Sequence, residues 1–299
     1  MDQDDQTTWP GRRLEQATGR LRSSGDWIDT AGLAARLRSF SFSNTLLIMD
    51  QYQTRLGNAK RPPVEPSMLA TRMEWSAIGC QVRNSEIGYS VSIPRGGIVV
   101  CDVAQLTPDS RVPTWRDPVL RGGQAPAGLV GELEALIRAD GYQVSDSGRD
   151  DSAGVDWESR SVLVRFDANQ AEQARMLATG LSRLWLRSPA AHQLPVSPHD
   201  PQVEAVTAAM MVCAAHGMAL DQHPAPTVDA WAGKPDMPGR AALVLGVGQS
   251  ALNMAVAILD RLDTAQTVDG SLASLKLNRA PLLPGLPAAT ATPGMAVGL

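Results

Sequence analysis

Arginine and aromatic side chains alternate along the first third of the chain. Seven of the thirteen aromatic residues lie within residues 1–94. This combination is typical of proteins that hold single-stranded nucleic acid, because cations contact the phosphates while aromatic faces stack on bases at about 1–3 kcal/mol per base. The aromatic residues are Trp9, Trp27, Phe40, Phe42, Tyr52, Trp75 and Tyr89, and the interleaved cations are Arg36, Arg38, Arg55, Lys60, Arg61, Arg72 and Arg83.

The same pattern also allows a purely structural interpretation. Phe42 and Trp75 lie on apolar helix faces, where large aromatic side chains usually belong to the core. The formal net charge of the whole chain is −4, which gives no global argument for nucleic acid. Residues 1–100 hold 12 Lys and Arg against 10 Asp and Glu, whereas residues 101–299 hold 15 against 21. This asymmetry favours the N-terminal part, weakly, as the side that contacts an anionic partner.

The histidines are not spaced for a zinc site. A zinc peptidase helix presents two histidines four residues apart, so that both lie on one face and bind the ion. Here His192 and His199 lie in a proline-rich segment, and His216 and His223 follow later in the chain. All four lie outside the helix predicted over 168–187, and we therefore expect solvated or structural roles for them.

Hydrophobic periodicity predicts a helix-rich chain with a few strands. A helix near 43–51 begins after Ser41 or Ser43, and the prolines of 57–67 indicate a loop. The predicted helices cover 12–38, 43–51, 68–79, 128–141, 168–187, 201–217 and 241–262, and the predicted strands lie in 81–94, 97–103 and 161–166.

Composition divides the chain into two domains of the α+β class. Residues 104–127 are rich in Pro, Gly and charge without a period, which is typical of a linker. We therefore expect one domain over 1–103 and a second, helix-rich domain over 128–263. The tail 264–299 is mostly Ala, Pro, Gly and Leu, and most of it is expected to be disordered.

A cytoplasmic location is expected. The N-terminal MDQDDQTTWP is acidic and polar, unlike a signal peptide. The run 241–259 has no charge but holds two amides and a serine, which favours a buried helix over a membrane span. The three cysteines are odd in number, widely spaced and without a C-x-x-C pair, which argues against a disulfide framework: Cys80, Cys101 and Cys213.

Five short segments, in order and spacing, resemble the N-terminal domain of the ArdC-type antirestriction proteins, a domain also found in TraC-type plasmid primases. The resemblance covers about 27–105. It implies that this part binds single-stranded DNA. The segments are FSFSNTLLIMDQ (40–51), the single Trp75 before Gly79, QVRNSEIG (81–88), SIP (92–94) and VVCDVAQ (99–105).

The resemblance also implies which residues contact DNA. The family usually has a Lys-Gly-Glu-Lys turn after the arginine, whereas this chain has Asn84-Ser85-Glu86-Ile87, so two lysines are lost and weaker phosphate binding is expected. The segment 56–67 also differs in length and proline content. The residues expected at the nucleic-acid site are Arg38, Ser43, Asn44, Arg55, Lys60, Arg61, Trp75 and Arg83.

In the same family a zincin-like metallopeptidase domain follows, and its metal helix is degenerate here. Residues 176–186, MLATGLSRLWL, resemble the His-Glu-x-x-His helix, with Thr179 and Arg183 at the histidine positions and Gly180 at the glutamate. Val206 takes the place of the third ligand. Glu204, two residues away, would be turned by about 200° on a helix, although a shifted alignment would make it a remnant ligand. These residues imply a retained fold without metal, cofactor or catalysis.

Three functional hypotheses remain open at this point. The first is a single-stranded-DNA-binding protein of the antirestriction or mobile-element type whose second domain is an inactive metallopeptidase-like domain. The second is a protein-interaction module that kept only the fold and binds a protein partner through the second domain. The third is a metallopeptidase with non-standard ligands. None of the three involves a membrane.

Overall fold

The computed structural model describes residues 3–58, 63–94, 96–110, 124–148, 154–187, 201–220 and 225–270, and the side chains of residues 11 onward within these ranges. The first part of the chain forms α1 (Gln3–Arg20), α2 (Ser24–Arg36), α3 (Phe42–Asn58), β1 (Leu69–Ala70), α4 (Arg72–Ala77), β2 (Tyr89–Ile93), β3 (Gly96–Asp102) and the 3-10 turn Val103–Gln105. We call this part, residues 3–110, the N-terminal unit.

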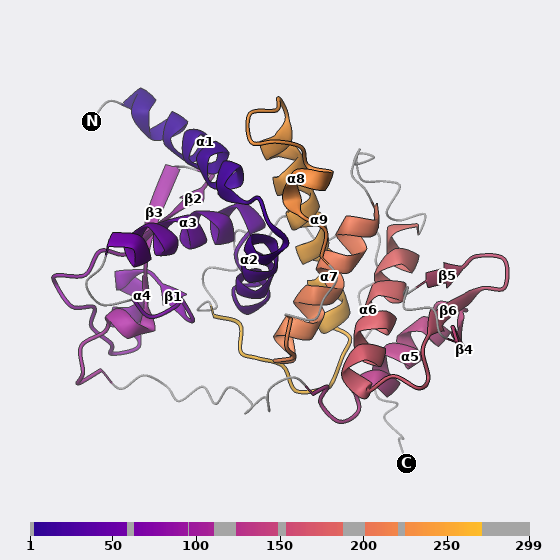
Figure 1. Ribbon diagram of the computed structural model, residues 1–299. Coiled ribbons are helices and arrows are strands. Elements are labelled where there is room, and N and C mark those ends of the chain that lie inside the picture. The colour runs from indigo at the N-terminus through magenta and orange to yellow at the C-terminus, as the bar shows by residue number, and fades with distance from the viewer. Residues whose placement is uncertain are drawn as a thin grey trace, which may run out of the picture.

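The second part, residues 124–270, is the C-terminal unit. It forms α5 (Leu129–Ala139), β4 (Gln143–Asp146), β5 (Gly154–Asp156), β6 (Ser161–Val164), α6 (Gln170–Leu186), α7 (Pro201–Ala215), α8 (Val228–Trp231) and α9 (Arg240–Leu259). In Figure 1 the sheet of the N-terminal unit lies at one end of the molecule, the second sheet lies with α5 and α6 at the other, and α7 and α9 lie between them.

Local capping explains where several of these helices begin. The expected single helix over 12–38 is wrong, because Ser23 starts a new helix there. Its side chain accepts from the backbone N of Asp26, and the Asp26 carboxylate accepts from the backbone N of Ser23. Helix α3 is longer than expected. In its first turn the backbone N–H of Asn44 donates to Ser41 Oγ. A capping box at Thr71 likewise starts α4, so the predicted helix 68–79 is a short strand followed by a short helix.

The N-terminal sheet has the order β1-β3-β2, with both pairs antiparallel. Helix α3 lies along the outer edge of β2. Asn44 exchanges two hydrogen bonds with the backbone of Ser92, at 2.9 and 2.8 Å, and Gln51 does the same with Ser90, at 2.8 and 2.9 Å. Two helix amides thus replace the strand that would otherwise pair with β2.

The C-terminal sheet has the order β4-β6-β5, with β4 parallel and β5 antiparallel to β6. Helix α6 packs on this sheet so closely that a Cβ at Gly180 would lie 2.3 Å from Val162 Cγ1. Apolar residues at helical spacing along α6 are buried: Ala174, Leu177, Ala178, Leu181, Leu184 and Trp185.

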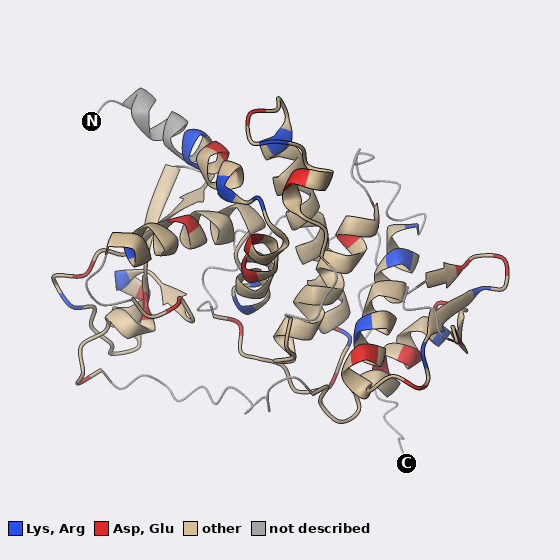
Figure 2. Ribbon diagram, viewed as in Figure 1, with Lys and Arg blue, Asp and Glu red and all other residues tan. Residues whose placement is uncertain are grey.

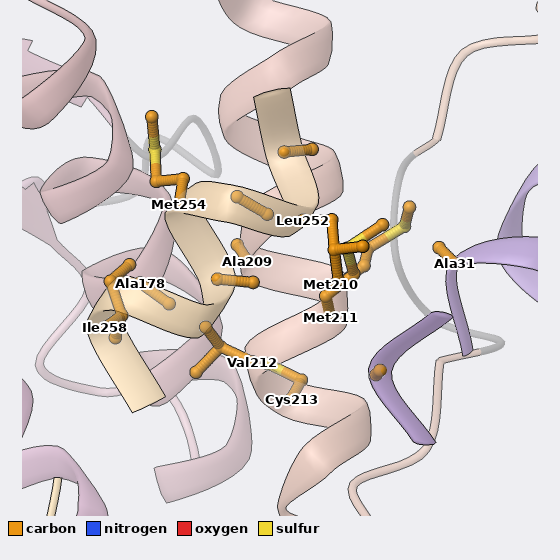
Figure 3. Close-up of a cluster of buried hydrophobic side chains, with 14 of the residues drawn as sticks. Ala31, Ala178, Ala209, Met210, Met211, Val212, Cys213, Leu252, Met254 and Ile258 are labelled. Atoms are coloured by element: carbon orange, nitrogen blue, oxygen red, sulfur yellow. The ribbon is translucent and has the colours of Figure 1, made fainter. Parts of the chain in front are cut away.

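One hydrophobic core joins the two units. Trp27 of α2 packs against the rings of Phe42 and Trp231, and its Nε1 donates to Thr207 Oγ1 of α7 at 2.9 Å. A Cβ at Gly248 of α9 would lie 2.2 Å from Phe42 Cε1. Figure 3 shows the centre of this core, where Ala31, Ala178, Ala209, Leu252 and Ile258 come from α2, α6, α7 and α9.

Helix α9 is, within the described ranges, long and apolar enough to cross a membrane by length and composition. It packs against α7, α1 and α3 in the shared core, as expected for a buried helix. The thiols of Cys80, Cys101 and Cys213 are free and buried.

Residues 263–270 cross from α9 to the N-terminal unit, and we call them the C-terminal strap. Glu132 of α5 accepts from the backbone of Asp263 and Thr264, and Thr267 N donates to Ala215 O at 2.6 Å. At the far end, Gly270 donates to Arg36 O and accepts from Leu69 N, both at 2.7 Å. The expectation of disorder is therefore wrong for 264–270, while 271–299 lies outside the described residues.

His216 is buried where the strap passes the end of α7. Its Nδ1 lies 2.8 Å from Val212 O, and its Nε2 has no hydrogen-bond partner within the described part of the chain. Burial lowers the pKa of His216 below 6.5, and this effect outweighs the bond to Val212 and the nearby Glu132 carboxylate. The imidazole is therefore neutral in the folded protein near neutral pH.

Gly248→Ala is expected to lower the free energy of unfolding by about 1–3 kcal/mol, because the added methyl meets the Phe42 ring in a packed core. Gly131→Ala is the matched control, since a Cβ on this glycine of α5 meets nothing within 4 Å. It should stabilise the protein by about 0.4–1 kcal/mol. Urea unfolding measures both effects. Equal effects of the two substitutions would contradict the close contact of α9 with α3.

His216 is expected to make the protein less stable as pH falls through about 6.5. As pH falls, the His216 imidazole is protonated in the unfolded chain before it is protonated in the folded protein. The free energy of unfolding therefore decreases until pH reaches the folded-state pKa. His216→Asn can keep the bond to Val212 but does not titrate. Its free energy of unfolding should therefore depend less on pH, by up to about 1.4 kcal/mol per pH unit. Parallel pH profiles for the two proteins would contradict a depressed pKa.

Candidate functional site

The structure divides the eight residues expected at the nucleic-acid site into groups. Arg55 and Arg83 line one cavity of the N-terminal unit, with a volume of about 440 Å³. Ser43 is half-buried in the first turn of α3. Lys60 and Arg61 lie outside the described residues and precede Pro62 and the cavity-lining Pro63 in the sequence. The full lining is Arg55, Pro63, Val64, Arg83, Ser85, Glu86, Ile87, Tyr89, Asp102, Ala104 and Gln105.

The other three predicted site residues have structural roles. Trp75 is fully buried, and its Nε1 donates to Cys101 O at 2.9 Å, so neither ring face is open to a base. Asn44 is 2% exposed and pairs with β2. Arg38 donates to Ala35 O and, at 2.7 Å, to Thr267 O of the strap. These contacts place the three in the framework of the fold instead of at a DNA-facing surface.

Arg55 lies in the last turn of α3, where helix geometry directs it over β2. Its guanidinium lies 4.1 Å from the centre of the Tyr89 ring, and Nη2 donates to Gly88 O at 2.5 Å. Burial raises the pKa of Tyr89 to about 12, with Arg55 acting against the shift. Arg55 is thus held over an un-ionised phenol, while the remaining guanidinium N–H groups are left for other acceptors.

A polar network forms one wall of the cavity. Arg83 donates two bonds to Glu86 Oε1, at 2.9 and 2.6 Å, and further bonds to the carbonyls of Leu106 and Ala104. Gln105 Nε2 donates to Glu86 Oε2 at 3.0 Å and to Ile87 O at 2.9 Å. Desolvation raises the pKa of Glu86, but the bonds from Gln105 and Arg83 outweigh it and lower the pKa overall. Glu86 is therefore an ionised acceptor in the neutral pH range.

The end of β3 also contributes to the cavity lining, through Asp102. Asp102 is 2% exposed and accepts from the backbone N of Ser67, Met68 and Ala104. Burial raises its pKa despite these bonds. Gly88 lets the chain pass against β3, since a Cβ there would lie 2.4 Å from Val100 O.

Sequence reasoning missed Tyr89, Glu86 and Gln105 as members of the site. Each lies within or beside a segment that carries the resemblance, so those segments were the available signal. Their convergence depends on a hairpin and a 3-10 turn that bring residues nearly twenty positions apart into contact. Figure 2 shows cations and carboxylates interspersed over both units, so charge alone does not mark the site.

The positions of α6 that the resemblance matches to the metal helix are unsuited to a divalent cation. The Thr179 hydroxyl donates to Arg175 O at 2.8 Å, and Gly180 has no side chain and no room for one beside Val162. Arg183 bonds to Gln202 Oε1, and burial lowers its pKa without removing its charge. A guanidinium at a ligand position repels a metal ion.

Helix α7 supplies no replacement ligands. Val206 is 9% exposed and apolar, and Glu204 is 4% exposed within the same buried helix. Glu204 was expected to face away from the position of Val206. It is nevertheless shielded from solvent, because neighbouring helices surround α7. Across the described ranges, no group of three or more His, Cys, Asp and Glu side chains could hold a metal ion.

Comparison with known proteins identifies the fold. No protein-family model matches the chain, and no curated protein matches it significantly. Two solved structures of the antirestriction protein ArdC from plasmid R388 match 83% of this chain and 97% of that chain. The Mn(II)-bound structure has a TM-score of 0.50 and 18% identity, and the metal-free structure has 0.48 and 14%. The α+β class is confirmed, and the resemblance to ArdC-type antirestriction proteins is confirmed at the level of the fold.

Proposed function

We propose that this chain is a single-stranded-DNA-binding protein of the antirestriction or mobile-element type, acting in the cytoplasm. The observation that carries the proposal is the cavity of the N-terminal unit. It brings Arg55 and Arg83 together with the exposed side chains of Val64 and Ile87 in a chain with the ArdC fold. Tyr89 is 3% exposed, so its ring positions Arg55 and does not stack on a base. Cations that track the phosphates are one of the elements that bind unpaired nucleic acid.

The cationic contribution comes from Arg55 and from residues that precede the cavity lining in the sequence. Arg83 is engaged by Glu86 and two carbonyls, so Arg55 is the lining arginine with donors to spare. Lys60 and Arg61 precede the cavity-lining Pro63 in the chain and supply two more positive charges. We propose these three residues, together with Ser43 at the start of α3, as the contacts to phosphate. Few contacts imply modest, salt-sensitive binding.

The C-terminal unit acts in this proposal as an inactive metallopeptidase-like domain. The related plasmid protein has been solved with Mn(II) bound. In this chain the positions corresponding to the metal helix hold Thr179, Gly180 and Arg183, and none of these side chains can bind the ion or act as a general base. The unit contributes a shared core and a surface for a protein partner.

Oligonucleotide binding tests the proposal directly. With three cationic phosphate contacts, log K for single-stranded oligonucleotides should fall with log salt at a slope near −2, and duplex should bind more weakly. Lys60→Ala with Arg61→Ala should reduce the slope by about 1.4. Arg138→Ala with Arg187→Ala removes equal charge from the C-terminal unit and should leave the slope unchanged. Fluorescence anisotropy measures each slope, and failure to bind single strands at low salt would refute the proposal.

Metal analysis tests the second unit. Purified protein incubated with Zn²⁺ or Mn²⁺ and desalted should retain no stoichiometric metal, and a chelator should not change its thermal midpoint. Gly180→Glu, which restores the glutamate of the motif, should cost about 1–3 kcal/mol because of Val162, and adding Val162→Ala should recover part of that loss. One tightly bound metal ion per chain would instead support a metallopeptidase with non-standard ligands.

A further inference from the structure

We propose that the cavity of the N-terminal unit binds a single unstacked base of the DNA strand and prefers bases that carry an exocyclic amino group. The inference rests on the proposed function, because it assigns a role to one cavity within the same interface. It goes further in naming the part of the nucleotide that enters and the residue that selects it, Glu86.

The entrance of the cavity is apolar. Val64 is 65% exposed and Ile87 is 77% exposed, and both belong to the lining, as does Pro63. Exposed aliphatic side chains that gather beside a cavity are candidate contacts for an apolar ligand surface. A flat base placed between them would remove this surface from solvent, as happens when unpaired bases are splayed out and recognised singly.

The charge balance of the cavity favours a base over a phosphate. Two arginines and two carboxylates line it, and Arg83 is committed to Glu86 and to the carbonyls of Leu106 and Ala104. A phosphate entering this space would meet the ionised Glu86 without a free bidentate partner. A neutral base carries no such cost, and the phosphate of the same nucleotide can then reach Arg55.

Glu86 provides the selectivity. A carboxylate has about four acceptor positions, and three are used here: two by Arg83 on Oε1 and one by Gln105 on Oε2. The network fixes the orientation of the carboxylate and leaves one acceptor position on Oε2. An amino group donates to it, as carboxylates do with cytosine N4. Thymine presents O4 at the same place, and two acceptors facing each other repel.

The test compares short oligo(dC) and oligo(dT) of about ten nucleotides, above neutral pH. Both are single-ring bases, so the comparison isolates the amino group. We expect roughly tenfold tighter binding of oligo(dC), equivalent to about 1.4 kcal/mol. Glu86→Gln should abolish this ratio, because its amide can donate to thymine O4. Glu65→Gln is the matched control, since Glu65 also pairs with an arginine of the N-terminal unit, Arg36, and it should keep the ratio.

A second pair of variants tests the entrance independently of the network. Val64→Ala with Ile87→Ala should weaken oligo(dC) binding several-fold without loss of stability, because both side chains are exposed. Met73→Ala removes a side chain that is 79% exposed and lies outside the cavity lining, and it should have no effect. These variants remain informative if Glu86→Gln fails to fold.

The outcomes separate this inference from the proposed function. Failure of the wild-type protein to bind any single-stranded oligonucleotide would refute both the proposed function and the base cavity. Salt-dependent binding with equal affinity for oligo(dC) and oligo(dT), unchanged by Glu86→Gln and by the entrance variants, would overturn the base cavity alone. Free deoxycytidine monophosphate should not compete at concentrations where the oligonucleotide saturates. Competition at equal concentration would mean that the cavity is a site for free nucleotides, which also overturns the inference.

Discussion

The docking of α2 and α3 onto α7 and α9 is the constraint on which the rest of the structure depends. Trp27, Phe42 and Trp231 meet there, and Gly248 allows α9 to approach the Phe42 ring. Because α3 also carries Asn44 and Gln51, the same helix that enters the shared core positions β2 and, through Arg55, the cavity. Packing in the centre therefore determines where the proposed interface lies.

Helix α6 of the C-terminal unit is held in place by its packing. Helix α6 keeps its apolar stripe and its contact with β6, although the motif positions hold residues that serve packing or surface bonds. Gly180 loses about 1 kcal/mol of helix propensity relative to Ala, yet it permits the contact with Val162. Close packing of α6 on the sheet is compatible with the absence of a glutamate side chain at position 180. Burial of the rest of α6 offsets the low helix propensity of Gly180.

Local signals predicted much of the fold. The hairpin of β2 and β3 and the helices α5, α6, α7 and α9 follow from periodicity and turn residues close in the chain. The strap and the two-residue strand β1 depend on partners far away, such as Gly270 with Leu69, and no local pattern encodes them. The site shows the same limit. Trp75 and Arg38 have the right types for binding DNA, but carbonyls distant in the sequence, those of Cys101 and Thr267, hold them in the framework.

The pairing of Asn44 and Gln51 with β2 has a consequence for how the molecule meets its surroundings. An unpaired strand edge recruits extended segments from other chains, and this is a common route to both peptide recognition and aggregation. In the N-terminal sheet one border is occupied by helix amides and the other by Gly270 beside Leu69. Where these groups bond to β2 and β1, the strand edges are therefore not open to an added strand from another chain.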